Sequence, residues 1–226
     1  MKKNLLGILF LFWVCMAWAG ELKLWYSKPA KDWTEALPVG NSRLGAMVYG
    51  GTGREELQLN EETFWAGGPY DNNNTNALYV LPVVRNLIFQ GKTREAQRLV
   101  DANFLARKDG MSYLTMGSLF LDFPGHEEAT DFYRDLNIED ATATTRYKVD
   151  GVTYTRRVFA SFTDSVIVVR LTTPGHKGKL NFSLRMQDGR QGMTRVDGHT
   201  MTIKGTLDLL SYEAQALLQA DGGMRD

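Results

Sequence analysis

Short runs in which apolar and polar residues alternate recur along most of the chain, and they constrain the fold more than any other feature. Residues 119–123 form one such run and residues 180–186 form another. Asp150-Gly151 between two further runs is typical of a two-residue β-hairpin turn. Runs at intervals of roughly 8 to 12 residues, with turn residues between them, predict a mainly β fold, a large antiparallel two-sheet β-sandwich.

Residues 77–106 follow a helical period instead, and they predict a helical hairpin inserted between strands. Pro82 suits a first helical turn, Gly91 can end the first helix in a left-handed conformation, and Thr93 can cap the second helix. The second helix has one apolar stripe, formed by Ala96, Leu99, Val100 and Phe104. We interpret the pair as two helices packing on a sheet rather than as a cofactor site.

The charge balance argues against a nucleic-acid partner. The chain has 26 Lys and Arg residues against 26 Asp and Glu residues, a formal net charge of zero. A groove for nucleic acid requires an excess of basic residues on one face, because it must neutralise phosphates. The glycines of residues 50–53 lead into a strand pattern without a following Lys-Ser/Thr pair, so we interpret them as a hairpin turn and predict no nucleotide or other cofactor.

No catalytic group or metal site emerges from residue spacing. Each of the histidines follows a glycine in a predicted turn, far from the other two, so we expect surface turns at His126, His176 and His199 and no metal. Ser42 lies in a turn with no helix after it, unlike the nucleophile of a serine hydrolase. Glu61 and Glu62 are neighbours on a strand and point to opposite faces, so they form no acid–base pair.

The first 19 residues have the pattern of a secretory signal peptide. Lys2 and Lys3 precede an apolar stretch that is shorter than the about 20 residues needed to span a membrane. We predict cleavage after Ala19, export to the periplasm or medium, and no membrane attachment after cleavage. Lipid attachment at Cys15 is the minor alternative, because the residues before it are bulky. Cleavage removes Cys15, and the mature chain then has no thiol.

Residues 20–226 are predicted to form one β-sandwich domain. Residues 211–220 alternate loosely, and a turn pattern follows at residues 221–223 without a further strand. A sandwich that ended there would leave an unpaired edge, which folded proteins usually cover. We therefore expect the domain to be incomplete at its C-terminal end.

One segment combines aromatic residues with amides and acids in the way that sugar recognition requires. In residues 57–70, aromatic rings can cover the C–H faces of a sugar while amides and acids bind its hydroxyl groups. The predicted substrate-binding residues are Asn60, Glu61, Thr63 and Trp65. The alternative, which stays open, is a strand end at which Trp65 and Tyr70 pack on the helical hairpin.

The same stretches carry a resemblance to a known family. The chain resembles the opening of glycoside hydrolase family 95, the α-L-fucosidases, along most of the mature sequence, at residues 25–47, 59–69, 111–113, 117–123, 133–137 and 158–161. The stretch from Leu59 to Pro69, LNEETFWAGGP, is similar to the second hallmark of that family. Two departures are Ser42, where the family often has glycine, and Thr115-Met116 before Gly117.

This resemblance implies a non-catalytic N-terminal β-sandwich domain. In that family a linker, an α/α barrel and a C-terminal β-domain follow, the catalytic carboxylates lie in the barrel, and hydrolysis inverts the anomeric carbon. No catalytic residue is therefore assigned to this chain. The implied partners are a fucosylated glycan and a catalytic barrel in cis.

Two other functions stay open. A free-standing carbohydrate-binding module would use the Trp65 region as its platform, and a related enzyme would act on another sugar, such as galactose, or by phosphorolysis.

Overall fold

A computed structural model describes residues 21–105, 111–176, 178–207 and 209–222. The predicted signal peptide lies outside the described residues. The chain divides into two compact units. The first contains residues 21–62, 117–186 and 220–222, and the second contains residues 63–116 and 187–219, apart from the residues outside the description.

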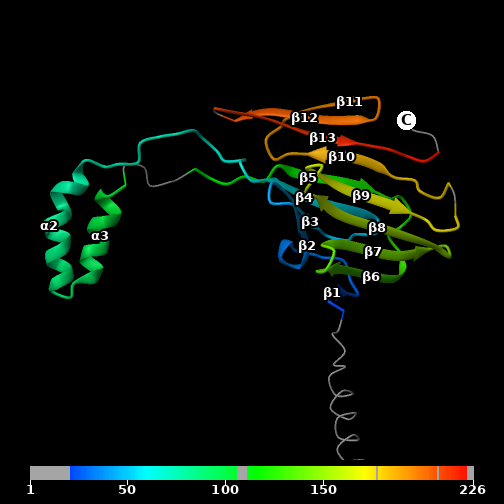
Figure 1. The fold of residues 1–226 in the computed structure, drawn as a ribbon, viewed down its shortest axis with the longest axis horizontal. Helices are drawn as coiled ribbons and strands as arrows, with labels where there is room; N and C mark the ends of the chain where they lie inside the picture. Colours follow the sequence, from blue (N-terminus) through cyan, green and yellow to red (C-terminus); the bar gives the residue numbers. More distant parts are fainter. Residues whose placement is uncertain (1–20, 106–110, 177, 208, 223–226) are drawn as a thin grey trace, which may run out of the picture. The chain divides into compact units, whose positions relative to one another are not determined.

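The first unit contains two five-stranded antiparallel sheets (Figure 1). One sheet has the strand order β1 (Lys23–Tyr26), β6 (Thr130–Asn137), β7 (Thr142–Val149), β8 (Val152–Ser161) and β9 (Val166–Thr172). The other has the order β10 (Ser183–Gln187), β5 (Gly117–Asp122), β4 (Arg54–Glu61), β3 (Leu44–Val48) and β2 (Leu37–Gly40), with the short 3-10 helix η1 (Trp33–Glu35) before β2. The predicted mainly β, two-sheet architecture is confirmed.

The alternation in the sequence builds the core between these sheets. Inward-facing residues of both sheets form one buried cluster: Leu37, Val39, Ala46, Val48, Leu57, Leu121, Phe123, Ala143 and Val158. Each strand contributes alternate residues because successive side chains point to opposite faces. The predicted glycine turn at residues 50–53 joins β3 to β4, as expected. Ser42 has φ +74°, a conformation that favours glycine, which gives a physical reason for glycine at this position in the family.

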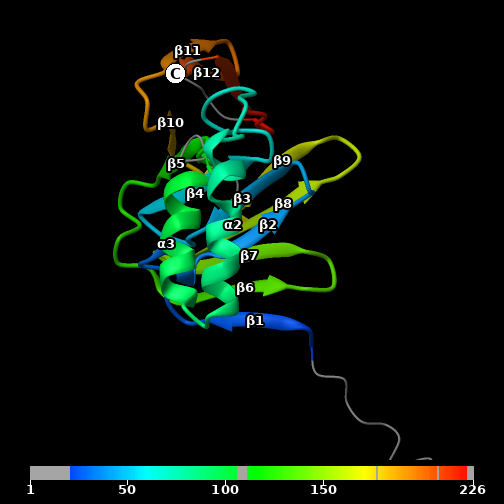
Figure 2. The same ribbon diagram turned by 90° about the vertical axis from the view of Figure 1, so that its left-hand side faces the viewer.

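The helical hairpin belongs to the second unit, and the two predicted helices are confirmed; their packing on a sheet stays a prediction. Helices α2 (Asn76–Phe89) and α3 (Thr93–Asn103) lie side by side (Figures 1 and 2), with Gly91 at φ +73° between them. Two details differ from the sequence prediction. Pro82 lies inside α2 rather than in its first turn, because the helix already begins at Asn76, and Thr93 is the first residue of α3 rather than its cap. With 14 and 11 residues, neither helix is long enough to cross a membrane.

The last strands form a third sheet that the sequence did not predict as separate. Strands β11 (Met193–Asp197), β12 (Thr200–Leu207) and β13 (Leu210–Leu217) pair consecutively and antiparallel within the second unit. The predicted Asp197-Gly198 turn joins β11 to β12. Ile203 and Tyr212 are the buried side chains of this sheet. The residues expected to extend the sandwich therefore pair with one another instead.

Candidate functional site

The four predicted sugar-binding residues fall into two groups, one in each unit. Asn60 and Glu61 end strand β4 in the first unit, where they pair with Gly45 and Leu44 of β3. The backbone N–H of Glu61 donates to Asn60 Oδ1 at 3.0 Å, and Arg43 Nε donates to Glu61 Oε1 at 3.3 Å. This part of the site is therefore a polar strand end with an ion pair at its surface.

Thr63 and Trp65 lie in the second unit, where Thr63 is part of a turn and Trp65 follows in a segment that pairs with residues 112–114. Trp65 and Tyr113 are opposite each other in an antiparallel bridge. Two backbone hydrogen bonds join the segments. The N–H of Ala66 donates to the carbonyl of Ser112 at 2.8 Å, and the N–H of Leu114 donates to the carbonyl of Phe64 at 2.9 Å. The N–H of Trp65 donates a hydrogen bond to the backbone carbonyl of Thr63 at 2.9 Å.

The pairing brings two exposed aromatic rings together. The ring centroids of Trp65 and Tyr113 are 4.7 Å apart at an interplanar angle of 43°. Trp65 is 42% exposed and Tyr113 is 47% exposed. We call these two residues the aromatic platform. Tyr113 was not among the predicted binding residues, although the Met111-Ser112-Tyr113 stretch carried part of the family resemblance.

Phe64 anchors the segment from the opposite side. Its side chain is only 3% exposed and meets the ring of Tyr212 edge-on, with centroids 5.1 Å apart. The guanidinium of Arg190 lies over the Phe64 ring at 4.9 Å. Phe64 is buried while its neighbour Trp65 is exposed, so the two side chains lie on different sides of the segment.

A polar cluster holds Tyr212 beneath this anchor. The Tyr212 hydroxyl donates to Asp188 Oδ2, and the backbone N–H groups of Arg190 and Gly192 donate to Asp188 Oδ1 at 3.1 and 3.0 Å. Burial raises the pKa of Asp188, but these hydrogen bonds outweigh it and hold the pKa below its ordinary value. Burial and the neighbouring carboxylate raise the pKa of Tyr212 to about 12, so it donates its proton at neutral pH.

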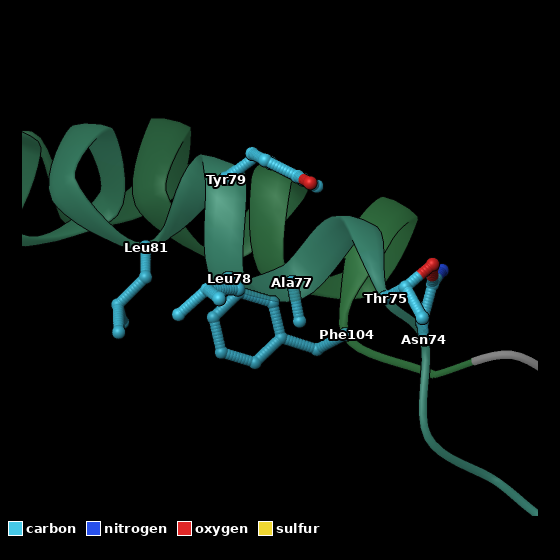
Figure 3. A pocket seen from close by; sticks show the side chains of 7 residues that line it. All are labelled: Asn74, Thr75, Ala77, Leu78, Tyr79, Leu81 and Phe104. Carbon is cyan, nitrogen blue, oxygen red and sulfur yellow. The ribbon is translucent and has the colours of Figure 1, made fainter.

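The helical hairpin has a hollow of its own. This open hollow of about 540 Å³ (Figure 3) is lined by Asn74, Thr75, Ala77, Leu78, Tyr79, Leu81 and Phe104. Leu78 and Phe104 lie close together in it, and the lining is mostly apolar. Only Asn74, Thr75 and Tyr79 offer polar side-chain atoms, so the hollow lacks the convergent polar groups typical of a small-molecule site.

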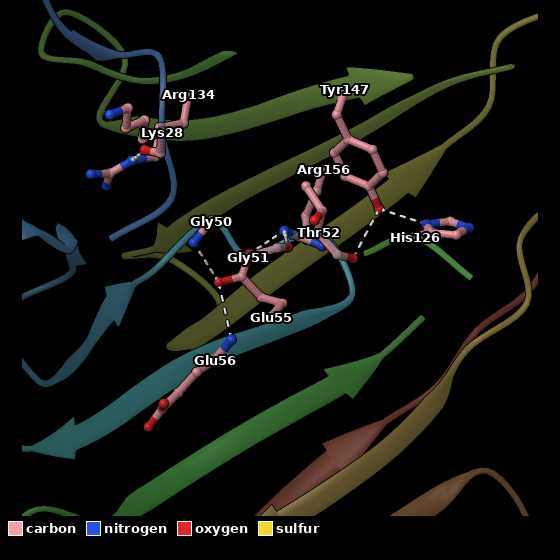
Figure 4. Close-up of polar contacts among 10 residues, drawn as sticks. All are labelled: Lys28, Gly50, Gly51, Thr52, Glu55, Glu56, His126, Arg134, Tyr147 and Arg156. Carbon is pink, nitrogen blue, oxygen red and sulfur yellow. Dashed lines mark hydrogen bonds and ion pairs between the residues drawn. The ribbon is translucent and has the colours of Figure 1, made fainter. Parts of the chain in front are cut away.

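The first unit contains a buried charged network with a structural role (Figure 4). Arg156 forms an ion pair with Glu55, and both side chains are almost fully buried. Arg156 Nη2 also donates to the carbonyl of Gly51 at 2.6 Å, and the N–H of Gly50 donates to Glu55 Oε1 at 2.7 Å. Burial raises the pKa of Glu55, and the Arg156 charge and the backbone N–H groups oppose this shift. The network ties the turn between β3 and β4 to strand β8.

The prediction of a surface histidine is wrong for His126. This side chain is 6% exposed, and its Nδ1 lies 3.0 Å from the hydroxyl of Tyr147. The rings of Tyr154 and Phe123 cover it as well, with centroids 4.4 and 5.5 Å away. Burial lowers the pKa of His126. His176 and His199 are exposed, as predicted.

The described residues contain no cluster of three or more His, Cys, Asp or Glu side chains that could hold a metal ion. The buried carboxylates of the described residues are Glu55, Asp135 and Asp188. Glu55 pairs with Arg156, Asp135 accepts from the Tyr133 hydroxyl at 3.0 Å, and Asp188 accepts from Tyr212. Each of these three carboxylates therefore contacts the side chain of another residue of the chain.

Comparison with known proteins gives the class to which this domain belongs. The profile described as "Glycosyl hydrolase family 65, N-terminal domain" matches residues 24–225, which is nearly all of the chain. The chain belongs to this family of glycoside hydrolase N-terminal domains. Its two-sheet sandwich and its third sheet both lie within the matched region.

The chain is similar to proteins named as α-fucosidases. It is 36% identical over 166 residues to alpha-L-fucosidase 2 of Arabidopsis thaliana, covering 72% of this chain and 19% of that protein. It is 27% identical over 184 residues to the probable alpha-fucosidase A of Aspergillus niger, covering 77% of this chain and 23% of that protein. It is 30% identical over 167 residues to the probable alpha-fucosidase A of Aspergillus oryzae, covering 70% of this chain and 22% of that protein. The resemblance to α-L-fucosidases is confirmed, and the chain spans about a fifth of the length of these relatives.

Proposed function

We propose that this chain is the non-catalytic N-terminal domain of an α-L-fucosidase-like glycoside hydrolase, with a catalytic barrel in cis that hydrolyses fucosyl linkages with inversion. The observation that carries the proposal is the family match across residues 24–225 together with the α-fucosidase relatives. Inverting hydrolysis requires an acid and a base about 6.5–9.5 Å apart with water between them. The three buried carboxylates, Glu55, Asp135 and Asp188, are each paired with another side chain of the domain, which favours a non-catalytic role.

The proposed substrate contacts are Asn60, Glu61, Thr63 and Trp65. The polar end of β4 offers amide and carboxylate groups for hydroxyls, and the exposed Trp65 ring offers a surface for C–H groups. We also propose export to the periplasm or medium. Mass spectrometry of the exported protein tests this directly: a mature chain that begins at Gly20 is expected, and retention of Met1 in the exported protein overturns export by a cleaved signal.

A chimeric enzyme tests the proposed activity. This chain replaces the matching region of the Arabidopsis thaliana relative, and hydrolysis of 2′-fucosyllactose is measured for the chimera, for the chain alone and for the relative without its matching region. The proposal expects hydrolysis by the chimera alone among these three. An inactive but folded chimera, or equal activity without the matching region, contradicts it.

A second candidate function is a free-standing carbohydrate-binding module. The exposure of both rings of the aromatic platform favours it, because exposed rings are the usual surface for sugar stacking. It predicts that the chain alone binds 2′-fucosyllactose and that the chimera gains no activity from it.

A further inference from the structure

The aromatic platform has the geometry of a two-ring binding surface. Trp65 and Tyr113 are opposite residues of an antiparallel pair, and directly opposite side chains lie on the same face. Their centroids are 4.7 Å apart, and the 43° angle between the rings leaves both of them partly open to solvent. Two rings in this arrangement offer more apolar surface than Trp65 alone.

The platform is held in place before any ligand arrives. Two backbone hydrogen bonds fix the segments that carry the rings, and the buried Phe64 fixes one segment against Tyr212. Gly67, at φ +97°, turns the chain directly after this segment. A surface that is already ordered loses little conformational entropy on binding, so the contacts that it makes contribute more fully to affinity.

The chemistry of the two rings favours a sugar with a large apolar face. Aromatic faces carry partial negative charge and attract the C–H groups of a pyranose. A 6-deoxyhexose has a methyl group where other hexoses have a hydroxymethyl group. Burial of this methyl group adds apolar contact that a hexose lacks.

We propose that Tyr113 is a second carbohydrate-binding residue and that it forms, with Trp65, a stacking surface for a 6-deoxyhexose residue of a neutral glycan. This inference rests on the substrate-binding role proposed for Trp65. Phe64 is a positioning residue for the surface, since its ring is buried on the opposite side of the same segment.

Calorimetric titration of the chain with 2′-fucosyllactose and with lactose tests the proposal. We expect saturable binding of 2′-fucosyllactose that is tighter than that of lactose. Tyr113→Ala should weaken it about tenfold, which is the effect of one aromatic contact, and Trp65→Ala should weaken it at least as much. Tyr113→Phe should keep the affinity within about twofold, because it retains the ring. Trp33→Ala, an exposed tryptophan of the first unit, is the matched control and should change nothing.

The near-ultraviolet circular dichroism of the paired rings separates positioning from stability. Phe64→Ala should reduce both this signal and the affinity, and Phe64→Leu should restore much of both. Equal affinity of Tyr113→Ala and the parent chain, or no binding of 2′-fucosyllactose, overturns the proposal, and equal affinity for the two glycans overturns the assignment to a 6-deoxyhexose. Tyr113-dependent binding with an inactive chimera would support the platform and contradict the proposed enzyme, so the two failures are distinguishable.

Discussion

The two units of this chain differ in the extent of their buried apolar cores. In the first unit, residues from both sheets bury one another in a continuous cluster that includes Leu57, Phe123 and Val158. In the second unit, helix α2 leaves large apolar side chains exposed, among them Leu78, Tyr79 and Phe89, and the aromatic platform is exposed as well. The first unit therefore has one continuous apolar core, whereas exposed apolar side chains of the second unit gather on helix α2 and on the aromatic platform, where they can take part in recognition.

The largest expected effect is in the first unit and comes from its buried ion pair. Arg156→Met should lower the free energy of unfolding by about 3–5 kcal/mol, because it leaves the Glu55 carboxylate buried without its partner. Urea denaturation measures the change. The exposed pair of Arg54 with Asp122 is the matched control, and Arg54→Met should cost at most about 1 kcal/mol.

A double variant sharpens this result. Glu55→Met combined with Arg156→Met removes both charges, and it should be more stable than Arg156→Met alone. If the double variant is the less stable of the two, the cost comes from lost packing and not from an unpaired charge.

The second expected effect is confined to the second unit. Phe64→Ala should destabilise this unit by about 3 kcal/mol, because it removes the ring packed on Tyr212 and Arg190. Hydrogen exchange measured by mass spectrometry should show faster exchange in β12 and β13, with the sandwich strands unchanged. Phe162→Ala is the control, because Phe162 is exposed in the first unit. Faster exchange throughout the sandwich would show that the two units do not unfold separately.

The third effect depends on pH and belongs to His126. Burial, which the nearby Arg156 reinforces and Glu127 and Asp150 oppose, lowers its pKa from the ordinary value of 6.5. The unfolded chain therefore takes up this proton first on acidification. The contribution of His126 to stability is complete above pH 6.5 and is lost as the pH falls through the folded pKa, with a slope of at most about 1.4 kcal/mol per pH unit.

Denaturation curves between pH 7 and pH 5 measure this slope, with His126→Gln as the comparison. Burial raises the pKa of Glu55, and this shift changes the stability with pH in the opposite direction to the shift of His126. The His126→Gln variant keeps the contribution of Glu55. The difference between the two proteins therefore reports His126 alone. Parallel curves would mean that the histidine titrates equally in the folded and unfolded chains.

The smallest effect on stability is expected at the exposed side chains of α2. Leu78→Glu with Phe89→Glu should change the free energy of unfolding by no more than about 0.5 kcal/mol per substitution, because neither side chain is buried. Self-association at high concentration, measured by sedimentation velocity, should decrease, because exposed apolar patches promote it. A loss of stability of several kcal/mol would show that these side chains are packed in solution.

The sequence allowed prediction of those elements whose pattern is local. The alternation of residues 119–123 and 180–186 predicted strands, and Gly91 predicted the turn between the helices, because each depends on neighbours in the chain. The separate third sheet was not predictable in this way. Alternation shows that β12 and β13 are strands with one buried face, but it does not identify the strands with which they pair.

The same limit applies to the site. Trp65 was predicted from its neighbours, whereas Tyr113 joins it only through an antiparallel bridge between segments far apart in sequence. His126 follows a glycine in a turn, and this local pattern indicates exposure. Its burial depends on the rings of Tyr147 and Tyr154, which come from strands later in the chain.

The most direct test of the central claim is a hydrolysis measurement on the purified chain alone, with 4-nitrophenyl α-L-fucoside as substrate. Release of 4-nitrophenol is expected at the rate seen without protein, because the proposed function assigns catalysis to a barrel domain outside this chain. Steady turnover that purifies with the chain and is lost on substitution of one of its own carboxylates would show that the domain is itself catalytic.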